Sequence, residues 1–175
     1  MFGFFRFKTG AIGFFCLTCM AILLSISLLS LTESETKQIR ESYRKALLSE
    51  SEIAPFKSLS SKYKTLPLGK AYHGTALAFE ARAAWSPTTK LSQANAAFTA
   101  LNEAVSNDPS NIEIRFLRLS FAHGTPDFLS MKGRIPEDKK ILLQGKIKGH
   151  PIGDIIQKFM KGSGLFSKDE LNRIQ

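Results

Sequence analysis

Two arginines lie within an otherwise apolar stretch of the chain, "NIEIRFLRLSF" at residues 111–121. A guanidinium group carries five N–H donors and keeps its positive charge, so its burial requires carboxylates or other acceptors. The same group can also hold a carboxylate of a partner through two parallel hydrogen bonds. The candidate residues for either a structural ion pair or a partner-binding site are Asn111, Glu113, Arg115 and Arg118.

Two interpretations of these arginines follow from the sequence. In the first, they belong to an internal ion-pair network, whose carboxylates are to be sought among Glu80, Glu103, Asp127 and Asp138. In the second, they form a basic stripe inside a concave helical groove and bind a carboxylate or an acidic peptide. The internal network is the favoured interpretation, because most residues around the arginines are apolar.

The residue types that carry out catalysis are not arranged for it. The three histidines, His73, His123 and His150, show no spacing typical of metal ligands. The pattern Ser-x-x-Lys occurs at 42–45 and 61–64, but the further motifs of serine acylases are missing. We therefore assign no catalytic, cofactor-binding or metal-binding residue, and we expect a non-enzymatic protein.

The composition is typical of one small globular domain with a targeting segment. The chain has 175 residues, of which 43% are hydrophobic. Its formal net charge of +9, from 24 basic and 15 acidic residues, favours anionic partners. No compact basic cluster is interleaved with aromatic residues, so nucleic acid is not the expected partner.

The N-terminal residues 1–31 have the pattern of a signal peptide or signal anchor. Arg6 and Lys8 precede an uncharged run of 21 residues at 11–31. A helix of that length spans roughly 30 Å, enough to cross a bilayer. The rest of the chain is therefore expected to be exported to the periplasm, either anchored in the inner membrane or released by cleavage. Cys16 and Cys19 lie inside this run, so the exported part has no disulfide.

The hydrophobic periodicity after residue 31 predicts helices throughout. Capping boxes open the first and last of them, at Thr32 and Ser167. The expected helices cover 32–49, a short segment after Pro55, 67–85, 89–106, 112–121, 136–144, 152–161 and a terminal segment after Ser167. Residues 112–116 also alternate as a strand would, but adjacent Phe116 and Leu117 break that period and favour a helix.

Some individual side chains can be assigned to the core from the same periodicity. In the first helix the expected inner face is formed by Ile39, Tyr43, Ala46 and Leu47. Leu91 belongs to the apolar pattern of the helix at 89–106. In the loop that follows Gly124, Phe128 and Leu129 are expected to pack against the core. Glu137 and Asp138 are acidic residues at a helix start, where they complement the helix dipole.

The stretch "AFTALNEAVSNDPSN" resembles the second helix and exit turn of a tetratricopeptide-type repeat. Ala97, Leu101, Ala104 and Pro109 fall at the small, large, small and proline positions of that repeat. The tryptophan/leucine–glycine–tyrosine pattern of a first helix is absent, and Pro87 interrupts its place. Together with "NIEIRFLRLSF", "TPDFL" and "EDKKILL", the stretch is similar to a family of short exported proteins of Gram-negative bacteria. That similarity covers about 67–143 and implies no catalytic residues.

The fold expected from these observations is all-α. It is a small tetratricopeptide-like array of antiparallel helical hairpins, with N-terminal helices at 32–66, a core at 67–143 and C-terminal helices at 144–175. The expected function is a non-enzymatic protein-binding or scaffolding module of the bacterial cell envelope, whose partner is an unknown protein or peptide. The alternatives are an envelope hydrolase with a site assembled from scattered residues and a basic protein that binds membrane surfaces. An open apolar groove would favour the binding module, and a closed polar pocket the hydrolase.

Overall fold

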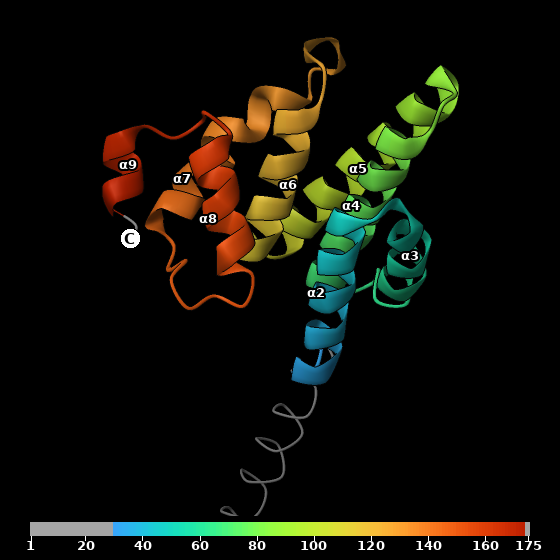
Figure 1. Ribbon diagram of the computed structural model, residues 1–175, viewed down its shortest axis with the longest axis horizontal. Coiled ribbons are helices and arrows are strands. Elements are labelled where there is room, and N and C mark those ends of the chain that lie inside the picture. The colour runs from blue at the N-terminus through green and yellow to red at the C-terminus, as the bar shows by residue number, and fades with distance from the viewer. Residues whose placement is uncertain (1–29, 174–175) are drawn as a thin grey trace, which may run out of the picture. The chain divides into compact units, whose positions relative to one another are not determined.

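The structure, a computed structural model, describes residues 30–173, and within them all regular secondary structure is helical (Figure 1). The N-terminal run at 11–29 lies outside the described residues, and so do Cys16 and Cys19. The α-helices in the described part are α2 Glu33–Leu48, α3 Ile53–Ser61, α4 Pro67–Ala83, α5 Pro87–Asn107, α6 Ile112–Gly124, α7 Ile135–Gln144, α8 Gly153–Gly162 and α9 Lys168–Arg173. None of these helices has the length and apolar character needed to cross a membrane.

The predicted capping boxes are confirmed at both ends of this region. Thr32 accepts a hydrogen bond from the amide of Glu35, whose carboxylate accepts one from the Thr32 amide at 2.9 Å. Ser167 and Glu170 make the same reciprocal pair at the start of α9. These bonds satisfy amides that have no partner within the helix, and so they fix where each helix begins.

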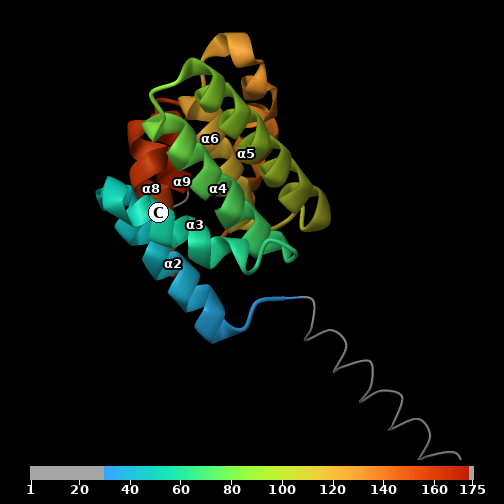
Figure 2. The same cartoon turned by 90° about the vertical axis from the view of Figure 1, so that its right-hand side faces the viewer.

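Prolines set the starts of the central hairpin. Pro67 occupies the first turn of α4 and Pro87 that of α5, where the missing N–H costs nothing. The helix α4 ends at Ala83, two residues earlier than predicted, and Trp85 lies in the three-residue connection with 96% of its surface exposed. Helices α4 and α5 run side by side (Figure 2).

The opening stretch is a helix, so the helical prediction is confirmed and the strand alternative is wrong. Asn111 caps α6 by accepting hydrogen bonds from the amides of Glu113 and Ile114. Because its neighbours surround it, α6 is buried over most of its length, including both of its arginines. It contacts α4 and α5 on one side and α7 on the other, and is therefore the central helix of the described part.

The core joins residues from all parts of this helical region. Its largest fully buried side chains include Tyr72, Phe56, Phe116 and Leu101. Tyr43, Phe56 and Tyr72 pack their rings together between α2, α3 and α4, with centroids 5.4–6.0 Å apart. Removing this much aromatic surface from water is the main stabilising contribution of such a cluster.

Three side chains assigned to the core differ from the prediction. Phe128, in the 3₁₀ turn Asp127–Leu129, is 81% exposed, whereas its neighbour Leu129 is partly buried. Leu47 and Leu91 are 39% and 47% exposed. For Leu47 and Leu91 the periodicity correctly places the side chain on the apolar face of its helix, but no neighbouring helix fully covers it.

Candidate functional site

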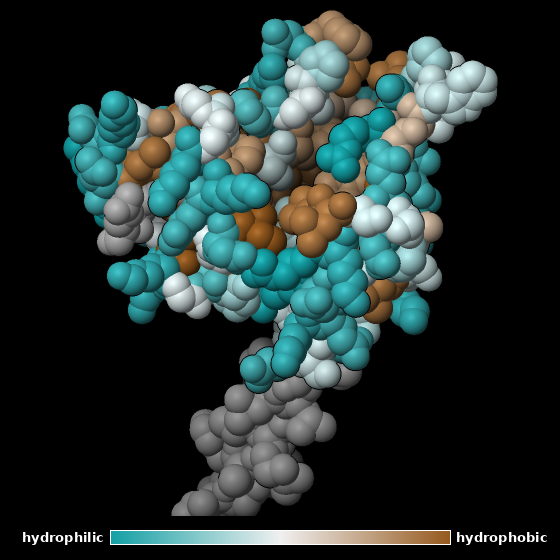
Figure 3. Space-filling model, viewed as in Figure 1, coloured by the Kyte–Doolittle hydropathy of each residue, from teal (hydrophilic) through white to brown (hydrophobic). Residues whose placement is uncertain are grey.

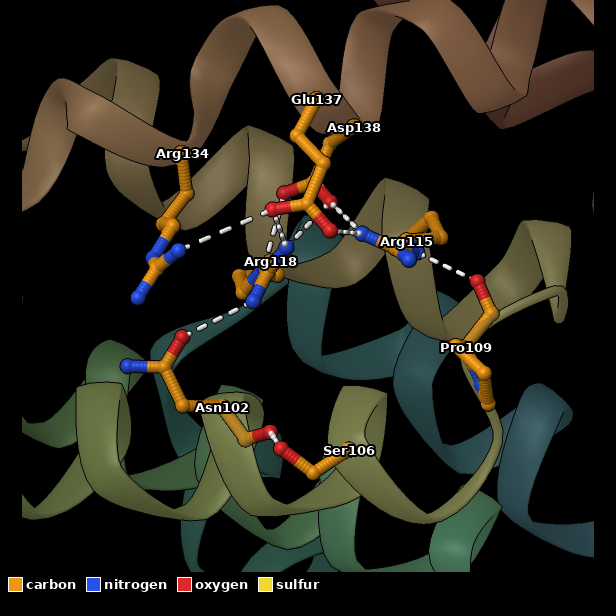
Figure 4. Close-up of polar contacts among 8 residues, drawn as sticks. All are labelled: Asn102, Ser106, Pro109, Arg115, Arg118, Arg134, Glu137 and Asp138. Carbon is orange, nitrogen blue, oxygen red and sulfur yellow. Dashed lines mark hydrogen bonds and ion pairs between the residues drawn. The ribbon is translucent and has the colours of Figure 1, made fainter.

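Arg115 and Arg118 form a buried ion-pair network with Glu137 and Asp138 of α7 (Figure 4). Asp138 is fully buried between the two guanidinium groups. Its Oδ2 accepts from Arg118 Nε at 2.8 Å, and its Oδ1 accepts from Arg118 Nη2 at 2.6 Å and Arg115 Nη1 at 3.0 Å. One carboxylate thus accepts three charge-assisted hydrogen bonds from two residues of one helix.

Other groups accept hydrogen bonds from further donors of the network. Arg118 Nη1 donates to Asn102 Oδ1 at 2.9 Å, and Arg115 Nε donates to the carbonyl of Pro109 at 2.6 Å. Glu137 accepts hydrogen bonds from both arginines. The hydrogen bond from Arg115 is the largest of the effects that hold the pKa of Glu137 below its usual range, and the positive charges of both arginines lower it further. The arginines therefore face carboxylates of their own chain, and each is at most 5% exposed.

Of the four carboxylates expected as partners, only Asp138 contacts the arginines. The other three pair with lysines instead: Glu80 with Lys57, Glu103 with Lys70, and Asp127 with Lys132. Glu137 was not expected in this role, because its place at a helix start accounts for an acidic residue without any partner.

Asn111 and Glu113, the other two candidates, are also engaged inside the fold. Beyond capping α6, Asn111 donates to the carboxylate of Asp108 at 2.9 Å. Glu113 is 1% exposed. Its carboxylate accepts hydrogen bonds from Nε and Nη2 of Arg40 in α2, that from Nη2 at 2.6 Å, and another from the hydroxyl of Tyr72. His150 Nε2 lies 3.7 Å from the same carboxylate. Glu113 thereby joins α2, α4 and α6.

The residues considered for catalysis are dispersed. His73, on α4, has a buried Nδ1 without a hydrogen-bond partner in the described structure, and burial lowers its pKa. The ring of His123 packs edge-on against Phe159, with centroids 5.6 Å apart. In neither Ser-x-x-Lys segment does the serine bond to the lysine, among the residues described. Within 30–173, no group of three or more His, Cys, Asp or Glu residues is placed to hold a metal ion.

An open apolar groove lies on the other side of α6. It has a volume of about 1390 Å³, and its walls are parts of α2, α4, α5, α6 and α8 together with 125–129. The phenylalanines that line this apolar groove are Phe79, Phe116, Phe121, Phe128 and Phe159. Figure 3 shows hydrophobic residues gathered in a hollow at the centre of this face, with hydrophilic residues around it.

Most of the exposed large hydrophobic side chains in the described part belong to this groove. Five such residues are exposed, and four of them line it: Leu47, Leu48, Leu91 and Phe128. The fifth, Trp85, is in the connection between Arg82 and Pro87, which both line the groove. Single exposed apolar residues are ordinary on protein surfaces, but a contiguous patch marks a binding surface.

Charged side chains surround the groove, and most are basic. The five basic residues are Arg44, Lys45, Arg82, Lys90 and Lys158, and the two acidic ones are Glu41 and Asp154. Arg44 holds Asp154 through two hydrogen bonds of 2.6 Å. Arg82 lies 5.2 Å from the centroid of the Phe79 ring. Within the described residues, the remaining basic side chains of the rim form no ion pair.

The groove was missed because periodicity does not show which apolar residues remain uncovered. One local signal was present: two leucines, Leu47 and Leu48, are adjacent at the end of α2, so the apolar surface there is wider than one narrow stripe. No family model, curated protein or solved structure matches this chain, so the function rests on the geometry described above.

Proposed function

We propose that this chain is a non-enzymatic protein-binding or scaffolding module of the bacterial cell envelope, and that it binds its partner in the apolar groove. The observation that carries the proposal is the position of the exposed large hydrophobic side chains, of which four out of five line one open groove. Each exposed leucine or phenylalanine forgoes stabilisation that burial would supply, about 1.5–3 kcal/mol when complete. A partner that covers the groove would recover part of this stabilisation.

The lining of the groove favours binding over hydrolysis. Its small hydroxyl residues are Thr75, Ser120 and Thr125, and each donates to a backbone carbonyl of α4 or α6. A nucleophilic hydroxyl needs a neighbouring base within hydrogen-bond reach. No histidine is among the described residues of the groove, and its two carboxylates lie at the rim.

The finer arrangement that we propose is a tetratricopeptide-like hairpin formed by α4 and α5. Gly74 of α4 supports it, because a Cβ at this position would lie 3.1 Å from the carbonyl oxygen of Ala97. Ala97 is the small residue of the repeat-like pattern, so small residues meet where the helices pack closely. In this assignment, Pro87 starts the second helix rather than interrupting the first.

The envelope location is supported by the sequence preceding the described residues. Arg6 and Lys8 followed by the uncharged run at 11–31 are typical of a signal peptide or signal anchor. Cell fractionation followed by mass spectrometry tests this part of the proposal. We expect the protein in the envelope, either intact from Met1 or cut near residues 30–34. Recovery of the intact chain from the soluble cytoplasm would contradict it.

Site-specific photo-cross-linking in living cells tests the groove itself. A photoreactive phenylalanine analogue is placed at Leu91 or Phe128 in the groove and, as the matched control, at Lys146, which is also exposed and lies outside it. We expect protein adducts from the two groove positions and none of the same mass from the control. Equal adducts at all three positions, or none at Leu91 and Phe128, would refute binding in the groove.

A further inference from the structure

We infer that the partner segment held by the groove is a short amphipathic helix with an apolar face flanked by acidic side chains. This inference rests on the proposed function and specifies the chemistry of its ligand. Three features of the groove carry it: its length, the distribution of its apolar side chains, and the sign of the charges on its rim.

The dimensions of the groove fit two turns of a helix. The wall formed by α6 runs from Phe116 to Gly124, which is about 12 Å at the rise of an α-helix. Two turns of a partner helix are about 11 Å long and about 10 Å across, with a volume of roughly 850 Å³. The groove is open and holds 1390 Å³, which is more than such a segment occupies.

An extended peptide would use this groove less fully. Over about 12 Å a strand brings roughly four residues, of which only alternate ones face the groove. Two turns of helix bring about seven residues, three or four of them on one face. The groove offers five phenylalanines together with Leu47, Leu48 and Leu91, so the helix covers more of the apolar surface. Recognition of this kind, an amphipathic helix in an apolar groove, is common among proteins.

The rim charges indicate which polar residues the helix carries. Lys45 is on α2, Arg82 and Lys90 are on the α4–α5 hairpin, and Lys158 is on α8, so several walls present basic groups. None of the four is in an ion pair within the described residues, whereas Arg44 of the same rim is already held by Asp154. Acidic side chains beside the apolar face of a bound helix would meet these groups, and lysines there would be repelled.

Binding can be measured by the fluorescence of Trp85. It is the single tryptophan of the chain, it is 96% exposed, and its neighbours Arg82 and Pro87 line the groove. The probe is a synthetic helix of about 18 residues, long enough to be helical, made of alanine, leucine, phenylalanine and glutamate. The full-length chain is held in phosphatidylcholine nanodiscs, because its apolar N-terminal run must be kept in solution. We expect saturable blue-shifted Trp85 emission that weakens as salt is added.

Peptide variants test the two parts of the inference. With lysine in place of every glutamate, we expect binding to be weaker by about tenfold or more. Several attractive charge pairs at the rim then become repulsive, and together they account for a change of this order. With two prolines in the middle of the peptide, which prevent a helix, we expect no saturable shift. Equal binding of the lysine peptide would overturn the acidic chemistry, and equal binding of the proline peptide would overturn the helix.

Protein variants locate the binding. Lys90→Glu with Lys158→Glu leaves two basic and two acidic groups at these four positions and should remove the preference for the acidic peptide, whereas the control Lys146→Glu with Lys148→Glu changes the net charge equally and should leave the preference unchanged. All four lysines are exposed, so these variants fold as the parent does. An equal loss in both pairs of variants would mean that only the net charge matters, and would overturn recognition at the rim.

Lipid is the competing ligand, and vesicles of phosphatidylglycerol measure it. If they produce the saturable Trp85 shift and the acidic peptide does not, the groove binds anionic lipid and the inference is wrong. The proposed function and the inference about the partner's chemistry can be refuted by different results. Cross-links at Leu91 and Phe128 in cells, together with no preference for the acidic helix, would refute only the partner's chemistry. The absence of those cross-links would refute protein binding in the groove itself.

Discussion

The side chains on the two sides of α6 are in opposite environments. On the side facing α7, Asp138 is buried between Arg115 and Arg118 and accepts hydrogen bonds from both. On the side facing the groove, Phe121 and the neighbouring Phe128 are left partly or largely open to water. The charged residues, which are the usual markers of a binding site, are enclosed, and the apolar residues, which are the usual markers of a core, are accessible.

The difference follows from what each kind of group loses when it lacks a partner. A buried guanidinium without acceptors is very unfavourable, so an arginine within an apolar helix indicates carboxylates nearby in the same fold. An apolar side chain in water costs less, and a fold tolerates several such residues together. Unfilled apolar surface is therefore the better indication of a partner in this molecule.

Asp138→Ala should have the largest effect in the network. It leaves two buried guanidinium groups without their central carboxylate, which costs roughly 3–5 kcal/mol of a total stability of about 5–15 kcal/mol. Urea unfolding followed by circular dichroism measures the loss. The matched control is Asp127→Ala, which removes the exposed partner of Lys132 and should leave the unfolding midpoint almost unchanged. Equal midpoints for the two variants would show that the network contributes no stability.

Arg118→Lys should have a smaller but clear effect, because it keeps the charge and loses the planar fork. The guanidinium contacts both oxygens of Asp138 and also Asn102, and one ammonium group cannot reach all three. We expect a loss of about 1–3 kcal/mol, measured in the same urea titration. The folded variant should still bind the acidic helical peptide as the parent does. Reduced peptide binding with unchanged stability would reverse the roles of the two sides of α6.

Leu48→Ser combined with Phe128→Ser should give the reverse result on the groove side. Both side chains are more than four-fifths exposed, so we expect the free energy of unfolding to change by no more than about 0.5 kcal/mol. Photo-cross-linking from Leu91 should nevertheless fall, since part of the partner's apolar contact is lost. A strong loss of stability with intact cross-linking would mean that these residues belong to the core.

A change in pH should produce the smallest effect, through His150. Burial lowers the pKa of this imidazole more than the nearby Glu113 raises it, and Arg40 lowers it further. Below pH 6.5, the ordinary pKa of histidine, His150 takes up a proton in the unfolded chain more readily than in the folded one. Its contribution to stability should therefore be complete above this pH and should decline as the pH falls. Comparing urea midpoints at pH 7.5 and 5.5 for the parent and His150→Gln measures it. The variant should lose less stability than the parent; an equal decline in both would contradict this.

The helices could be predicted from the sequence because their signals are local. The caps at Thr32 and Ser167 and the proline at 67 fix helix starts without reference to any neighbour. Pro87 also starts a helix, although the helix there was predicted to begin at residue 89. The pairing of buried arginines with acidic residues could also be anticipated, although only Asp138 was identified as a partner. Glu137 was missed because a local explanation, the helix dipole, already accounted for it.

The groove could not be predicted, because it depends on the separation of helices that are distant in the sequence. The periodicity around Leu91 shows that this face of the helix is apolar, but whether another helix covers it depends on how α2, α6 and α8 pack. Close contacts between helices, such as that of Gly74 in α4 with Ala97 in α5, are likewise not revealed by the spacing within one segment. Predicting an open surface requires the whole arrangement of the helices.

The position of α6 between the ion-pair network and the groove has a consequence for how this protein can evolve. The residues at 115, 118, 137 and 138 satisfy one another, so a change at one is tolerated only with a compensating change at another, and these positions should covary among descendants of this chain. Positions 48, 91 and 128 contact few neighbours and can each be substituted alone. Single substitutions can therefore change the surface of the groove while the network on the opposite side of the same helix preserves the fold.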